Sequence, residues 1–155
     1  INLFDNIMFK AASNLFFPKS IAYLHSANII VVTNLAADGL SLFKRETDAR
    51  LTKIADISLD FFVFSINVDV DDTLWLVIHP VLHESVEFFA QNTRNVATRL
   101  FKLKVDIKNY RLVDYVAEEV FRTDGSLLNA VGSSVYFNQN LVIFSFVSDP
   151  KVCFI

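Results

Sequence analysis

Cysteine, glycine and proline are scarce in this chain of 155 residues, and each shortage excludes a class of protein. The single Cys153 excludes a disulfide framework and a cysteine-cluster metal site. Three glycines and three prolines exclude collagenous and linker-like compositions, and the scattered glycines cannot form a phosphate-binding loop. A net charge of −3 argues against nucleic acid as a partner. The uncharged stretches 20–37 and 125–148 contain too many polar residues for a transmembrane helix of roughly 20 apolar residues.

Apolar residues, by contrast, are abundant, at 53% of the chain with 16 phenylalanines. This content excludes intrinsic disorder and predicts a single domain over residues 1–155. The first residue, Ile1, and the many phenylalanines fit an AT-rich organellar gene, and they fit a biased nuclear gene equally well. We expect the isolated chain to aggregate, because so much apolar material exceeds what the core of a monomer needs.

Hydrophobic periodicity predicts both helices and strands. Helices are expected over 3–17 (an amphipathic N-terminal helix within residues 1–18), 35–46, 86–101 and 110–121. Strands are expected over 28–33 and 51–58, with hairpins over 62–78 and 134–147. The predicted fold is therefore α+β, a mostly antiparallel sheet with helices packed on one face in the core 19–155.

Two groups of side chains are candidates for a metal site. His79, His83 and Glu84 have a spacing that could hold a metal on a helix, but Pro80 interrupts the segment and the HExxH order is absent. Asp69, Asp71 and Asp72 lie at the predicted tip of the hairpin 62–78, where a solvated acidic turn is the simpler interpretation. Cys153 has no histidine nearby in the sequence. We therefore predict no catalytic residue, no bound cofactor and no metal.

Short motifs resemble the NADH dehydrogenase subunit 9 family, the 30-kilodalton-type core subunit of respiratory complex I. They are Phe43-Lys44-Arg45-Glu46, the segment 50–58 around Asp56, Leu112-Val113-Asp114-Tyr115, and Arg122-Thr123-Asp124-Gly125-Ser126-Leu127. The family's Trp-x-Glu-Arg-Glu run is replaced here by residues 90–95. The matched positions Asp56, Asp114, Tyr115, Arg122 and Asp124 are then the expected interface.

This resemblance implies a structural subunit of the peripheral arm of mitochondrial NADH:ubiquinone oxidoreductase, on the matrix side of the inner membrane. Its partners would be the subunit-7-type and iron–sulfur subunits, and it would bind no cofactor and have no transmembrane segment. Alternatives are a scaffold subunit of the ATP synthase or the mitochondrial ribosome, or a free-standing enzyme or ligand-binding domain with a pocket near His79 and His83. For the interface, we expect Arg122 and Tyr115 to contribute more than Asp71 and Asp72.

Overall fold

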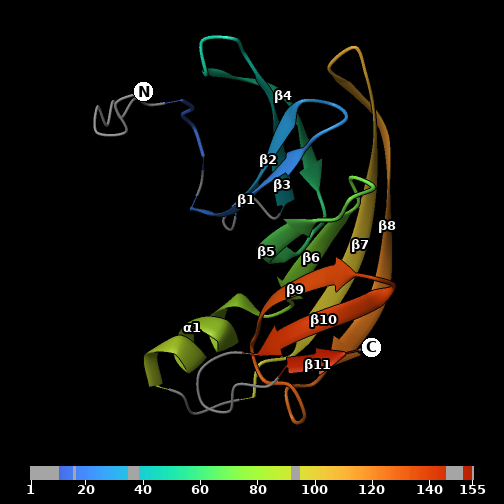
Figure 1. Ribbon diagram of the computed structural model, residues 1–155. Helices are drawn as coiled ribbons and strands as arrows, with labels where there is room; N and C mark the ends of the chain where they lie inside the picture. The colour runs from blue at the N-terminus through green and yellow to red at the C-terminus, as the bar shows by residue number, and fades with distance from the viewer. Residues whose placement is uncertain (1–10, 16, 35–38, 92–94, 146–151, 155) are drawn as a thin grey trace, which may run out of the picture.

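Antiparallel strands make up most of the described chain in the computed structural model (Figure 1). The structure describes residues 11–15, 17–34, 39–91, 95–145 and 152–154. The strands are β1 (Pro18–Leu24), β2 (Ile29–Asn34), β3 (Gly39–Arg45), β4 (Leu51–Ser58), β5 (Phe62–Val68), β6 (Leu74–His79), β7 (Thr98–Lys108), β8 (Arg111–Thr123), β9 (Val131–Phe137), β10 (Asn140–Ser145) and β11 (Val152–Phe154). One helix lies within these ranges, α1 (Leu82–Gln91), and it follows β6.

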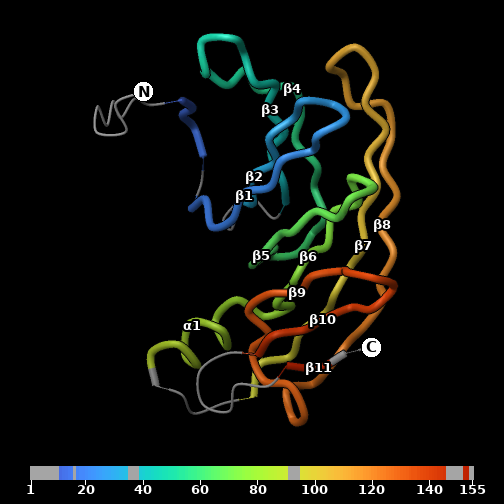
Figure 2. The backbone as a smooth tube through the Cα atoms, in the orientation of Figure 1, coloured from blue at the N-terminus to red at the C-terminus, as the bar shows by residue number. Residues whose placement is uncertain are grey.

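The strands form three antiparallel sheets in which neighbours follow one another along the chain. The strand orders are β1-β2-β3-β4, β5-β6-β7-β8 and β11-β10-β9. The first strands of successive sheets lie together, because β1 contacts β5 and β5 contacts β9. Small antiparallel sheets with their first strands gathered around one axis are the blades of a β-propeller. We name them blade 1 (β1–β4), blade 2 (β5–β8) and blade 3 (β9–β11), and Figure 2 follows the chain through them in that order.

The hydrophobic core lies between the blades. All residues of β6 are buried, and they alternate between two clusters, as the period of two along a strand requires. Leu74, Leu76 and Ile78 belong to the cluster between blades 1 and 2. Trp75 and Val77 belong to the cluster between blades 2 and 3. Each fully buried aliphatic side chain contributes about 1.5–3 kcal/mol, so the continuous apolar run of β6 holds three blades together.

Helix α1 lies beyond the end of β6, after a turn at Pro80, which ends the strand because proline has no N–H to donate. Glu84 lies in the first turn of the helix, where the helix dipole favours a negative charge. Phe88 is buried and packs with Val96 and Ala130, so the helix is attached to the segment that leads into blade 3.

The predicted α+β class is wrong, and two of the predicted helices are strands. Residues 39–45 of the predicted helix 35–46 form β3, while 35–38 lie outside the described residues. The alternation of Leu40 and Leu42 with Ser41 suits a strand between two others, and a Cβ at Gly39 would overlap the carbonyl oxygen of Ile57. Pairing with the two neighbouring strands therefore determines the structure of this segment and overrides its local helical pattern.

The predicted helix 110–121 is β8, the outer strand of blade 2. Its valines, Val113, Val116 and Val120, are β-branched and favour strands, and its pairing with β7 continues from Thr98 to Lys108. Of the predicted helix 86–101, residues 86–91 are helical, residues 92–94 lie outside the described residues, and Thr98 begins β7.

Several strand predictions are confirmed. Residues 28–33 and 51–58 correspond to β2 and β4, 62–78 to the β5–β6 hairpin, and 134–147 to the β9–β10 hairpin as far as Ser145. Of the predicted N-terminal helix 3–17, residues 3–10 and 16 lie outside the described residues, and 11–15 are not helical. Within the described ranges, α1 is too short to span a membrane.

Candidate functional site

A ladder of aromatic rings lies where β5 begins and β6 ends, beside the first residues of β1. Phe64 is its centre: its ring stacks on His79 with 4.5 Å between centroids and on Phe89 of α1 with 5.6 Å. The Lys19 ammonium lies 4.6 Å from the centroid of the Phe64 ring. The ladder runs from solvent to core, because Phe89 is 44% exposed whereas His79 is 1% exposed. Residues from β1, β5, β6 and α1 thus meet at one end of the inner strands.

His79 joins blade 2 to blade 3 through both of its ring nitrogens. Its Nε2 lies 2.9 Å from the carbonyl oxygen of Val131, and its Nδ1 lies 2.9 Å from the hydroxyl of Ser85. A carbonyl oxygen can only accept, so Nε2 carries the hydrogen and Nδ1 accepts the hydroxyl proton of Ser85. Burial lowers the pKa of His79; the hydrogen bond to Val131 opposes this, and the charge of Lys19 adds to the lowering. His79 is therefore a neutral imidazole with a fixed tautomer.

Ser85 and His79 have the geometry of a nucleophile and its base, with Val131 as the group that orients the base. Both side chains are buried, however, at 3% and 1% exposure. Ser85 also lies in the first turns of α1, where its hydroxyl is 3.5 Å from the carbonyl oxygen of Val81. A substrate cannot reach a hydroxyl in this position, so the pair attaches α1 to blades 2 and 3.

The structure separates the predicted histidine group. His79 ends β6 inside the core, whereas His83 is exposed on α1 and Glu84 belongs to the next position of that helix. Within the described ranges, no three His, Cys, Asp or Glu side chains are close enough to hold a metal ion. Cys153 is half-buried in β11, against the cluster between blades 2 and 3.

Two of the three aspartates at the predicted acidic tip make hydrogen bonds within the chain. The Asp69 carboxylate accepts hydrogen bonds from the backbone N–H of Thr73 and from the indole N–H of Trp75, both at 2.9 Å. The Asp72 carboxylate accepts two backbone hydrogen bonds from the β1–β2 turn. Asp71 is exposed. These carboxylates order the β5–β6 turn and attach it to blade 1.

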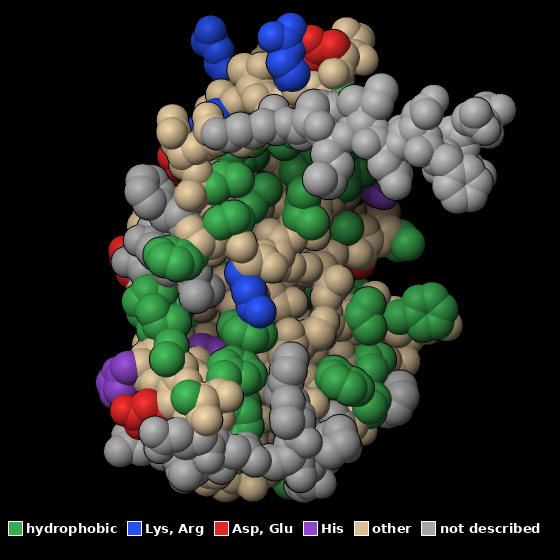
Figure 3. Space-filling view, turned by 90° about the vertical axis from the view of Figure 1, so that its left-hand side faces the viewer, with side chains coloured by type: hydrophobic (Ala, Val, Ile, Leu, Met, Phe, Trp, Pro, Cys, Tyr) green, Lys and Arg blue, Asp and Glu red, His purple; other side chains and the backbone are tan. Residues whose placement is uncertain are grey.

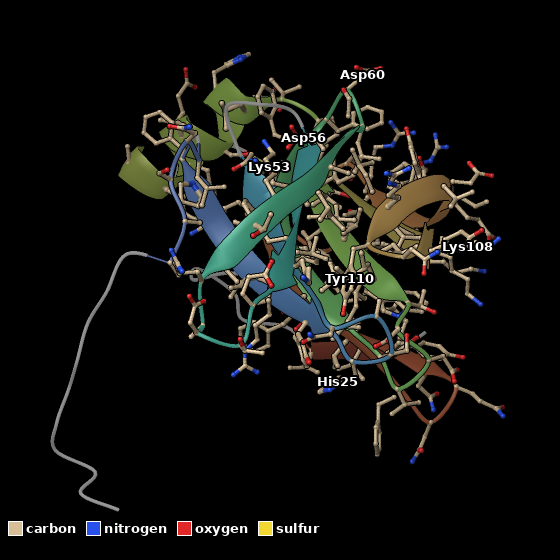
Figure 4. The ribbon with its side chains drawn as sticks, turned by 90° about the horizontal axis from the view of Figure 1, so that it is seen from above. His25, Lys53, Asp56, Asp60, Lys108 and Tyr110 are labelled. Carbon is tan, nitrogen blue, oxygen red and sulfur yellow. The ribbon has the colours of Figure 1, made fainter. Side chains whose placement is uncertain are left out.

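The five positions matched to the complex I subunit lie on β4 and on or after β8. Asp56 pairs with Lys53 on β4 (Figure 4) and accepts a hydrogen bond from Ser41. The others lie on or after β8. The Asp114 carboxylate accepts a hydrogen bond from the backbone N–H of Tyr115, and the Tyr115 hydroxyl donates one to the carbonyl oxygen of Ser58. Arg122 forms an ion pair with Glu119, and the Asp124 carboxylate accepts a hydrogen bond from the backbone N–H of Ser126. Each of these contacts is within the chain: in blade 1, in blade 2, between the two blades, or in the segment that follows β8.

Sequence reasoning missed the ladder residues Lys19, Phe64 and Phe89. Phe64 falls in the predicted hairpin 62–78 and Phe89 in the predicted helix 86–101, and none of the three residues was singled out. A mixed Phe–His–Lys group has no fixed spacing, so only the contacts between strands reveal it.

The relationship of the chain to known proteins agrees with this fold. The family model described as arylesterase matches residues 5–153. The chain belongs to the arylesterase family. It is also similar to mechanosensory abnormality protein 6 of Caenorhabditis elegans, with 25% identity over 139 residues, which are 87% of this chain and 36% of that relative. The chain therefore spans little more than a third of the length of this relative.

Family membership overturns the resemblance to complex I and, with it, the predicted structural role in a respiratory or other mitochondrial assembly. The physical reason lies in the motifs. The segment around Asp56 lies in blade 1 and the segment from Leu112 to Tyr115 lies in blade 2, at equivalent outer strands of two sheets. Short runs such as these recur wherever amphipathic strands do, so they indicate strands without indicating a family.

Proposed function

We propose that the chain hydrolyses aryl esters and that the ring ladder forms the substrate-binding wall of its site. The observation that supports this most is the ammonium of Lys19 beside the Phe64–Phe89 stack. Aromatic faces bind a planar aryl group, and a cation next to them stabilises the charge that develops on an ester carbonyl. Membership of the arylesterase family supports the same reaction.

In the proposed reaction, the contribution of Lys19 is electrostatic. Water adds to the carbonyl carbon and gives up a proton to the bulk solvent, and the negative charge of the tetrahedral intermediate develops on the oxygen beside Lys19. The bond to the aryl oxygen then breaks, and the aryl oxide takes up the proton that water gave up. An aryl oxide leaves readily, since the pKa of a phenol is about 10. One well-placed donor to the oxyanion increases the rate by about 10²–10³.

His79 has a positioning role in this proposal. It is neutral and stacked beneath Phe64, and its hydrogen bonds to Ser85 and Val131 hold the ring in one orientation. Phe64 therefore rests on a rigid support and presents the aryl-binding ladder at a fixed position. A site whose residues are held by a second layer of contacts keeps the geometry that catalysis requires.

The test is hydrolysis of phenyl acetate by the purified chain. We expect a rate above that of buffer, a fall in kcat/KM of at least about tenfold in Lys19→Met, and recovery in Lys19→Arg, because the charge is what matters. Phe64→Leu is expected to raise KM. Lys108→Met is the matched control, because Lys108 is exposed at the far end of β7. A wild-type rate equal to that of buffer, or Lys19→Met equal to wild type, would refute the proposal.

A further inference from the structure

His79 is a buried titratable group whose two protonation states both fit the hydrogen bonds around it. In the neutral state, its Nδ1 accepts the hydroxyl proton of Ser85, whose oxygen also lies 3.5 Å from the carbonyl oxygen of Val81. A hydroxyl rotates about its C–O bond to suit its partners. Once Nδ1 takes up a proton from solvent, it can therefore donate to the Ser85 oxygen while the hydroxyl donates to Val81. The hydrogen bond from Nε2 to Val131 is unchanged, so protonation leaves each of these polar groups with a partner.

The ammonium of Lys19 is the charge that acts on the His79 ring. At this end of the sheets, the described elements around the ring carry these titratable side chains: Lys19 on β1, His83, Glu84 and Glu87 on α1, Arg99 on β7 and Tyr136 on β9. Among their charges, that of Lys19 adds to the effect of burial and lowers the pKa of His79. The ammonium and the imidazole lie 4.6 Å and 4.5 Å from the same Phe64 centroid. They are thus within about 10 Å of each other, the Debye length at 0.1 M salt, so two positive charges at these positions repel.

Lys19 is the group of the ladder that can respond to this repulsion. Its side chain is exposed on β1, whereas His79 is held by two hydrogen bonds and Phe64 stacks on both His79 and Phe89. An imidazolium on Phe64 is itself a cation on that ring, so it competes with the ammonium for the negative potential of the ring face. Figure 3 views the molecule from the side of β1 and α1, where a basic side chain lies at the surface among hydrophobic ones. The ammonium can therefore leave the ring for water.

We propose that protonation of His79 expels the Lys19 ammonium from the Phe64 ring, which makes the ring ladder a switch operated by acid. At neutral pH the ladder holds an uncharged imidazole and the ammonium. In acid it holds the imidazolium inside the core, while the ammonium lies in solvent. The inference rests on the proposed function only for its consequence, which is that the site loses its cation in acid. The displacement itself involves the chain alone and can be measured without a substrate.

NMR of the isotopically labelled chain, titrated from pH 8 downwards, tests the switch. The ring current of Phe64 should shift the Cε protons of Lys19 upfield at pH 8, and this shift should disappear in acid. Its midpoint should coincide with that of the His79 Cε1 proton, which reports the charge of the imidazole. In His79→Gln the Lys19 shift should persist at every pH, because the amide stays neutral. The wild-type comparison of the two midpoints remains a test if this variant does not fold.

Lys44 provides the matched control within the same chain. Its ammonium lies 4.8 Å from the centroid of the Tyr110 ring, and Lys44 pairs with Ile29 at the end of blade 1 away from this site. Its ring-current shift should therefore persist while that of Lys19 disappears. Simultaneous loss of both shifts would mean general unfolding and would overturn the inference. A Lys19 shift that stays constant while His79 titrates would overturn it too, as would a His79 ring that stays neutral wherever the chain is folded.

Hydrolysis of phenyl acetate over the same pH range separates this inference from the proposed function. The ratio of kcat/KM between wild type and Lys19→Met removes the pH dependence of the reaction itself. This ratio should be at least about tenfold above the His79 midpoint and close to one below it. Displacement of Lys19 in a chain that does not hydrolyse the ester would support the switch and refute the hydrolase. Hydrolysis that depends on Lys19 equally above and below the midpoint would refute the switch and support the hydrolase.

Discussion

The carboxylate of Asp72 joins two blades, because it accepts hydrogen bonds from the backbone N–H groups of His25 at 2.9 Å and Ser26 at 2.7 Å. Asp72 lies in the β5–β6 turn of blade 2, and His25 and Ser26 lie in the β1–β2 turn of blade 1. Burial would raise the pKa of Asp72, but the hydrogen bonds from Ser26 and His25 outweigh it and hold the pKa below its usual value.

We predict that Asp72→Ala lowers the free energy of unfolding by about 1–2 kcal/mol, because two backbone donors lose a charged acceptor. Asp71→Ala, next to it and exposed, is the control and should change the stability by less than about 0.5 kcal/mol. Since the folded pKa is depressed, this contribution is fully present above the unfolded pKa near 3.8 and is lost as the pH falls through the lower folded pKa. Urea melts of the two variants at pH 7 make the comparison, and equal losses would contradict the bridging role.

The strands that the sequence predicted correctly share one property. In β2, β5 and β6, β-branched and large apolar residues are concentrated, and turn residues such as Asp71 and Asp72 separate the hairpin strands, so local patterns were enough. The segments that form β3 and β8 were wrongly predicted as helices, because the spacing of their apolar side chains also fits one face of a helix. Only their neighbours decide: β3 lies between β2 and β4, and β8 pairs along the full length of β7.

The candidate site could not be predicted from the sequence, for a different reason. Its residues lie at positions 19, 64, 79 and 89, on four elements of two blades and a helix, and no local spacing relates them. His79 was singled out as half of a metal pair with His83, but a turn at Pro80 directs the chain out of the sheet and separates the two. The position of His79 at the end of a fully buried strand was the available signal that it is a core residue.

We predict that His79 makes the stability depend on pH near neutrality. Its folded pKa lies below the unfolded value near 6.5, so the unfolded chain binds the proton first and stability is lost as the pH falls below about 6.5. His79→Gln should flatten this dependence and cost roughly 2–4 kcal/mol at pH 7.5, because Val131 and Ser85 lose well-placed partners. Chemical denaturation at pH 7.5 and 5.5 measures both effects.

His83→Gln is the matched control for His79, since the His83 side chain is exposed on α1. This variant should retain the wild-type stability and its pH dependence. If the slope between pH 7.5 and 5.5 persisted in His79→Gln, another group would be responsible for it.

Glu119 is the centre of a charged group in blade 2. It accepts a hydrogen bond from Arg99 Nε at 2.6 Å and pairs with Arg122 Nε at 2.6 Å. Burial would raise the pKa of Glu119, but the hydrogen bond from Arg99 and the charges of both arginines lower it below the usual value. Arg122, the predicted interface residue, is itself well exposed.

We therefore predict that Glu119→Gln lowers the melting temperature more than Arg122→Gln does. Removing Glu119 leaves two guanidinium groups close together without their shared anion, whereas removing Arg122 leaves Glu119 paired with Arg99. Glu118→Gln is the control, because Glu118 is a neighbouring residue with a single exposed partner, Lys102. Thermal melts at pH 7 rank the three, and a larger loss in Arg122→Gln would show that the arginine has a role outside this charged group.

Blade 3 has an apolar face turned away from blade 2. Val135 pairs with Val142, and Phe144 pairs with Val152, so these side chains share one side of the sheet. Phe137 is 66% exposed and Phe144 is 48% exposed. This face gives a structural reason for the expectation that the isolated chain aggregates.

We predict that the double variant Phe137→Ser/Phe144→Thr increases the monomeric fraction of the purified chain without lowering its melting temperature. The Phe137 ring is largely in solvent and the Phe144 side chain is about half exposed, so their replacement forfeits only a modest amount of burial within the chain. It also breaks up an apolar patch that favours association. Val70→Thr is the control, because Val70 is an isolated apolar side chain at 99% exposure in the β5–β6 turn and should change neither quantity. Light scattering after size-exclusion chromatography measures the association. An unchanged distribution in the double variant would place the associating surface elsewhere, and a lower melting temperature would mean that these rings pack within the chain.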